Sequence, residues 1–446
     1  MPRSPSRPPD ISSPTGPSFV EQFGACKAEL PGMGLSWVRD LREAGIERFA
    51  AHGLPSPRLE AWKYTSLRPL AKLDFVPAPS GSASIDKLPT LLPGGEGGHR
   101  LVFVNGAFRA DLSRLGDLPE GAEIGGLAAA LERGPDGIAA HLGRIGDGAE
   151  QPMLALNTAM MRDGLALRLK RGVRVAMPIE VVFLGAAGPA PMAYHPRNLI
   201  VLEPGSRAFV IEHHSGLGEG AYFANGGTEI LIGDGAALNH YKLQAEAPDA
   251  FHLSTVHVRL GRGAYYDAFT LSTGARLSRN ESHVRLDGPG ANCRLNGAYL
   301  MRGQQHCDNT TVIEHLKERT SCREVFKGVI DDKARAVFRG RIVVHPHAQK
   351  SDGHQLSKAL LLSSMAEVDT KPELEIYADD VKCSHGATVG DLDHDALFYL
   401  RSRGIPEAAA RNILIEAFLA ETIDEIAAGG LCPALMSSVG HWLADA

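Results

Sequence analysis

Several familiar catalytic signatures are missing from this sequence. It contains no Gly-Lys dipeptide, which excludes a P-loop and ATP hydrolysis of that class. It also has no HExxH, no G-x-S-x-G and no C-x-x-C motif, and the classes of enzyme and metal site that depend on those motifs are disfavoured. For its 446 residues the chain is poor in catalytic signatures.

Membrane and export signals are also lacking. We find no run of 18 apolar residues, so no membrane span is predicted. The first 18 residues hold arginine, proline and serine without an apolar core, which predicts a flexible tail and no secretory signal. A net charge of −6 disfavours a nucleic-acid or membrane-surface binder.

Cysteine is scarce, which favours a reducing, cytoplasmic location over a disulfide scaffold. The six cysteines are Cys26, Cys293, Cys307, Cys322, Cys383 and Cys432.

The N-terminal part, residues 19–150, is expected to be a mostly helical domain. Residues 36–52 have the apolar spacing of an amphipathic helix, and Gly53 follows as a stop. Proline and glycine then interrupt the chain, and the segment 80–99 is loop-like.

Residues 151–392 change to short alternating apolar runs bounded by glycine turns, the pattern of β-strands. Small-residue turn steps recur roughly every 30 residues, which is typical of a stacked β-solenoid. A two-sheet sandwich is the alternative, although this texture is long for one sandwich. The recurring steps begin at Gly172, Gly205, Gly235, Gly263 and Gly290.

The C-terminal part, residues 393–446, is strongly helical in pattern. Asp393 is expected to cap a first helix that Gly404 ends, and Pro406 suits the first turn of a second. That second helix carries an apolar stripe from Leu414 to Ile426. The helices could cap the open end of the solenoid, dock a partner, or simply pack on the solenoid.

Cys383 and His385 are the best candidates for site chemistry. They follow an apparent strand, in which residues two apart project from the same face. Sulfur and imidazole donors suit iron or zinc, but two ligands make only half of a tetrahedral site. A buried thiol beside a surface imidazole is the simpler alternative. Of the other histidines, the adjacent pair His213 and His214 would face opposite ways.

At this point the sequence resembles a known family. "KPELEIYADDVKCSHGATVGDLDHDALFYLRSRGI" with "ARNILIEAFLAETIDEI", and upstream "GLPSPRLEAWKYTSL", resemble motifs of the SufB/SufD family. The likeness covers most of residues 53–428 and implies a right-handed parallel β-helix with helical domains on both sides. SufB chains have a cysteine where this one reads Gln355-Leu356-Ser357, and His-Glu at His385-Gly386. Both departures favour the SufD branch.

The resemblance implies a non-catalytic scaffold for iron–sulfur cluster assembly. It implies that His385, with Cys383 close by, contributes to a transient cluster at an interface with a SufB-like paralogue, whose cysteine and carboxylate complete the site. It also implies that the C-terminal helices dock a SufC-like ATPase, so that this chain itself binds no nucleotide; whether the complex binds a flavin stays open. The expected docking residues are Phe398, Tyr399, Arg403, Leu414 and Phe418.

Three other functions stay open. The chain could be a SufB-like scaffold, a self-associating homodimer in which two His385 sites meet, or a β-solenoid carbohydrate-active enzyme. The last is weakened because the acids Asp379 and Asp380 are adjacent and would face opposite ways in a strand.

Overall fold

The structure is a computed structural model, and it describes residues 18–78, 85, 88–89, 98–134, 137–146, 151–426 and 430–444. The predicted tail, residues 1–18, lies outside this range except for Ser18. Within the described residues no helix is both long enough and apolar enough to cross a membrane.

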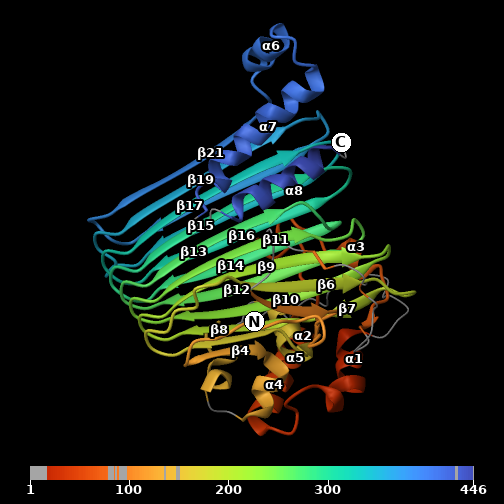
Figure 1. The fold of residues 1–446 in the computed structure, drawn as a ribbon, viewed down its shortest axis with the longest axis vertical. Coiled ribbons are helices and arrows are strands. Elements are labelled where there is room, and N and C mark those ends of the chain that lie inside the picture. Colours follow the sequence, from red (N-terminus) through yellow and green to blue (C-terminus); the bar gives the residue numbers. More distant parts are fainter. Residues whose placement is uncertain are drawn as a thin grey trace, which may run out of the picture.

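Most of the molecule is a stack of parallel coils (Figure 1). From β8 onward, consecutive strands alternate between two sheets, and each strand as far as β19 pairs in parallel with the strand two places further along the chain. One sheet has the order β20-β18-β16-β14-β12-β10-β8-β5-β4 and the other β21-β19-β17-β15-β13-β11-β9-β6-β2-β3. This arrangement is a β-solenoid of about eight turns, as predicted from the recurring turns.

The strands have the following bounds: β1 Val76–Pro77, β2 His99–Val104, β3 Ala107–Phe108, β4 Ala122–Gly126, β5 Leu165–Leu169, β6 Ile179–Ala186, β7 Met192–Tyr194, β8 Arg197–Leu202, β9 Arg207–Leu217, β10 Tyr222–Ile232, β11 Ala237–Ala245, β12 Phe251–Leu260, β13 Tyr265–Ser272, β14 Leu277–Leu286, β15 Asn292–Met301, β16 His306–His315, β17 Ser321–Ile330, β18 Arg335–Val344, β19 Asp352–Leu361, β20 Glu367–Ile376 and β21 Lys382–Gly390.

The helices have the following bounds: α1 Phe19–Cys26, η1 Lys27–Glu29, α2 Ser36–His52, η2 Glu60–Trp62, α3 Arg68–Ala71, α4 Leu127–Glu132, η3 Gly137–His141, α5 Pro152–Met160, α6 His394–Ser402, α7 Glu407–Ile423 and α8 Cys432–Ala444, where η denotes a 3-10 helix. The predicted helix 36–52 is confirmed, and Gly53 ends it at φ +64°.

Inward side chains form columns that run along the stack. In-register pairing joins Ile230, Val258, Val284, Ile313 and Ile342 into one column, and each of these residues is at most 1% exposed. β-Branched side chains fit such a ladder because they pack well on a pleated surface. The column reaches Leu374 in the last coil, where the side chain is only partly buried.

The glycine turns predicted from the sequence adopt the left-handed conformation. Gly172, Gly205, Gly235, Gly263 and Gly290 have φ between +59° and +75°. The equivalent turns of the next coils are occupied by Arg319 and Lys350, at φ +58° and +61°. The turn geometry therefore continues after the glycine signal has ended.

The N-terminal helices cover the outer face of the first sheet (Figure 1). The Trp-Lys-Tyr-Thr segment anchors this cover, because the Arg279 guanidinium stacks 4.1 Å above the Trp62 ring and donates to the Ala61 carbonyl. Thr65 also hydrogen-bonds His306 and Asp308 of β16.

Helices α7 and α8 lie on the outer face of the second sheet, whereas α6 projects beyond the last coil (Figure 1). Ile415, Leu419 and Ile423 of α7 are buried in a cluster with outward-facing strand residues such as Phe269 and Val329. This apolar stripe therefore packs against the side of the solenoid, and the expectation that it could cap the open end is wrong for α7 and α8. As predicted, Asp393 caps α6, accepting from the amides of Asp395 and Ala396.

Candidate functional site

Cys383 and His385 lie on β21, the last strand of its sheet. β21 pairs in register with β19, and no other strand pairs with it in the described part of the chain. β20 likewise ends the other sheet. The last coil therefore presents two strand edges with unpaired backbone donors and acceptors.

The two side chains point inward at this open end. Cys383 packs against the core between the sheets, and His385, two residues further along the same strand, projects from the same face. The imidazole is exposed, whereas the thiol is half-buried. The same-face prediction is thus confirmed.

A column of cysteines lies beneath Cys383. Register joins Cys293, Cys322, Gly353 and Cys383, and Gly353 places no side chain between the last two thiols. Cys322 Sγ lies 3.1 Å from the Nε2 atom of His315. Burial raises the pKa of each of these three cysteine thiols.

The next inward column ends at His385. It contains Glu324, Gln355 and His385 on three successive strands of the sheet. Gln355 donates a 2.6 Å hydrogen bond to the Glu324 carboxyl, and both side chains are buried. A surface pocket of about 310 Å³ also borders this column, lined among others by Arg323, His354, Ser384 and His385.

These two columns of inward-facing residues were not identified from the sequence, although the sequence contains a signal for them. Their members are spaced by one coil, so aligning the strands by the turn period would have brought Cys293, Cys322 and Cys383 together. Cys307 is not part of this column, because it lies on β16 in the opposite sheet.

The donor set at the last coil is incomplete within this chain. Across the described residues, no third His, Cys, Asp or Glu donor converges with Cys383 and His385. The arrangement can supply one thiolate and one imidazole, which leaves positions of a metal ion open to another donor.

The predicted docking residues fall into two groups. Phe398 and Tyr399 of α6 are 72% and 56% exposed, and the Arg403 side chain lies over the Tyr399 ring. Leu414 and Phe418 of α7 instead pack partly buried against the solenoid-facing cluster. Lys327 of β17 lies 4.7 Å from the Phe418 ring centre and donates to the Phe418 carbonyl.

The fold is a β-solenoid whose last coil presents a thiol and an imidazole, donor types that suit iron or zinc. Residues 183–418 match the family model described as "SUF system FeS cluster assembly, SufBD core domain", and residues 97–181 match "SufBD protein N-terminal region". The chain belongs to the SufB/SufD family of iron–sulfur cluster assembly proteins.

Curated relatives agree along nearly the whole chain. The iron–sulfur cluster assembly protein SufD of Escherichia coli is 34% identical over 89% of this chain and 91% of its own length. A SufBD family protein of Synechocystis is 32% identical over 90% of both chains. SufD of Bacillus subtilis is 25% identical over 91% of this chain and 93% of its own length.

Proposed function

We propose that this chain is a SufD-like, non-catalytic scaffold subunit that pairs with a SufB-like paralogue and contributes ligands to a nascent iron–sulfur cluster. The relatives named SufD are described as cluster assembly proteins, which supports the scaffold role. The observation that carries the proposal is the position of Cys383 and His385 on the unpaired last coil.

An open solenoid end suits pairing with a second chain of similar fold. Unpaired strand edges can extend a sheet across an interface. The last coil also exposes apolar side chains that water does not favour: Met365, Ile376, Tyr377 and Val389, each between 44% and 62% exposed.

Shared ligation would serve assembly and release alike. Cys383 and His385 hold half of a coordination sphere, and donors from the partner complete it. A small relative movement of the subunits then removes half of the ligands at once, so the cluster is held during assembly and freed afterwards.

The exposed aromatic pair on α6 is the proposed contact for a SufC-like ATPase. Phe398 and Tyr399 are large apolar groups with little cover from this chain, and aromatic residues are enriched at protein interfaces. Phe398→Asp should abolish co-purification of the ATPase while leaving the β-helix pairing unchanged.

The ligand role is tested by co-expressing this chain with SufB-like and SufC-like partners. His385→Ala should leave complex formation intact but lower anaerobically measured iron and sulfide to a small fraction of the parent value, because the shared site loses one of its ligands. His354→Ala is the matched control, since that histidine lies on the neighbouring strand and is also exposed. An undiminished cluster content in His385→Ala would refute the ligand assignment.

A further inference from the structure

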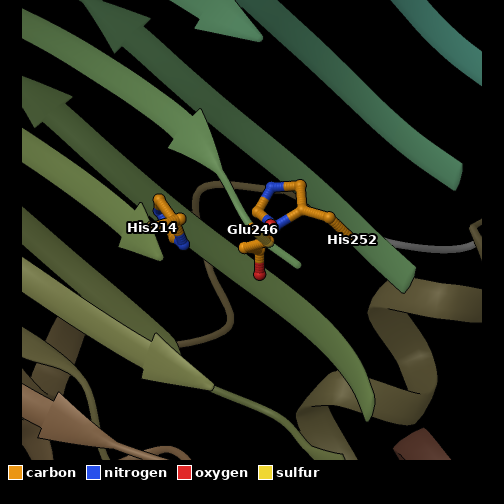
Figure 2. Close-up of side chains that lie close together, drawn as sticks. All are labelled: His214, Glu246 and His252. Atoms are coloured by element: carbon orange, nitrogen blue, oxygen red, sulfur yellow. The ribbon is translucent and has the colours of Figure 1, made fainter. Parts of the chain in front are cut away.

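A second group of potential metal ligands lies inside the solenoid, several coils from β21. His214 is on β9, Glu246 directly follows β11 and His252 is the second residue of β12. One donor atom from each lies within 4.8 Å of the other two, and all three residues are buried. In Figure 2 the Glu246 side chain lies between the two imidazoles.

The three side chains converge without satisfying one another. His252 Nδ1 lies 2.8 Å from a Glu246 carboxylate oxygen, yet the ring nitrogen has no well-aligned hydrogen-bond partner. A short distance without hydrogen-bond alignment is expected when two ligand atoms point at a common third position instead of at each other. Donors of a tetrahedral zinc ion are about 3.3 Å apart for bonds near 2.0 Å, so only small side-chain shifts are needed.

A further oxygen atom nearby also lacks a partner. Gln244 donates through Nε2 to Glu246 at 3.0 Å, but its Oε1 atom is buried and unpaired. The Gln244 side chain is fully buried. Unsatisfied buried polar atoms are costly, and a bound cation would satisfy them.

The charge of the enclosed cluster favours a cation. Glu212 and Glu246 are two buried carboxylates, and the buried Lys242 amine lies 3.0 Å from His252 Nε2. A neutral imidazole and a charged carboxylate are the forms that bind metal ions.

The surroundings resemble a second coordination layer. His214 Nε2 lies 2.8 Å from a Glu212 carboxylate oxygen. A carboxylate that accepts from the remote ring nitrogen commonly fixes the orientation of a metal-bound histidine.

We propose that His214, Glu246 and His252 form an internal structural site for a first-row divalent metal ion, zinc or ferrous iron. Two imidazoles and one carboxylate suit either ion. The site is separate from Cys383 and His385, and it holds a resident ion that stabilises the middle coils, not a cluster in assembly.

The test uses the full-length chain with Cys383→Ser and His385→Ala, so that the last coil cannot contribute metal. The protein is purified over a chelating resin from cells supplemented with zinc or, separately, with cobalt as a spectroscopic probe. About one equivalent of metal should remain. His214→Gln, Glu246→Gln and His252→Gln should each lose it, whereas the control His257→Gln, also on β12 but outside the site, should retain it.

A measurement on the unsubstituted ligand set avoids reliance on variants that fold poorly. X-ray absorption of the cobalt- or zinc-loaded protein should show only nitrogen and oxygen donors, with the multiple scattering of two imidazoles. Absence of metal from the purified chain, or equal metal content in the three variants and the control, would overturn the proposal. In that case a proton on one of the imidazoles, instead of a metal ion, balances the buried carboxylate charge.

Discussion

The two ends of the solenoid are built differently. At the N-terminal end, β6 and β8 are buried along their whole length, and Phe108 of β3 and Ile124 of β4 pack against the core where the parallel stack ends. At the other end, β20 and β21 contain no buried residue. Strands of one architecture are thus covered at one end and left open at the other, and this difference supports the proposal that a partner chain binds at the open end.

The ion pairs show the same contrast in a matched geometry. Arg197 of β8 pairs with Glu229 of β10, and Arg341 of β18 pairs with Glu375 of β20, in each case two residues beyond the in-register partner. The first pair is at most 2% exposed, whereas both members of the second are 40% exposed.

The largest expected effect comes from breaking these two pairs. Arg197→Met should lower the free energy of unfolding by about 3–5 kcal/mol, because it leaves the Glu229 charge buried and uncompensated. Arg341→Met should cost about 1 kcal/mol or less, because water screens an exposed pair. Urea unfolding of both variants measures the difference, and equal costs would contradict the contrast between the ends.

A buried carboxylate nearer the open end sharpens the comparison. Glu229 is paired with Arg197, whereas Glu324 is fully buried with a hydrogen bond from Gln355 and no recorded cationic partner in the described structure. Burial raises the pKa of Glu324 to about 7, against smaller opposing effects of Thr311 and Gln355.

Glu324 should therefore make stability depend on pH. Because folding favours its protonated form, the native state is penalised as pH rises from about 4.5, the unfolded value, to above 7, by roughly 3 kcal/mol for a shift of this size. Glu324→Gln removes the penalty. The free energy of unfolding of the variant, relative to that of the parent, should therefore be higher at pH 8 than at pH 5. The exposed Glu318→Gln is the control, and a variant-to-parent difference that does not change with pH would refute this assignment.

Much of this fold could be predicted from sequence, because alternation and recurring glycine turns are local signals. The turn signal stops at Gly290 because Arg319 and Lys350 occupy the same left-handed position in later coils. The stripe of α7 was recognised correctly, but a stripe does not specify its target, which is the outer sheet face and not the open end.

The site was predictable only in part. The common face of Cys383 and His385 follows from strand geometry within three residues. The buried group of His214, Glu246 and His252 depends on the register of strands from three coils, and no local pattern encodes it. Strand alternation predicts that His213 and His214 face opposite ways. Alternation alone does not say which of the two rings lies in the solenoid interior.

The smallest expected effect concerns the turns. Gly263→Ala should cost about 1 kcal/mol, because a side chain at φ +59° is strained although no neighbouring atom obstructs it. Lys350→Gly should change stability by less than about 0.5 kcal/mol, because relief of strain and the greater flexibility of unfolded glycine offset each other. Thermal unfolding of both variants tests this, and a large loss in Lys350→Gly would show that its side chain has a separate role.

Hydrogen–deuterium exchange of the last coil tests the central claim most directly. In the isolated chain, amides on the free edges of β20 and β21 should exchange quickly, and addition of a SufB-like partner should protect residues 367–376 and 382–390 strongly. Protection confined to another surface, with these two strands unchanged in a stable complex, would contradict the claim that the open end is where the partner completes the metal site.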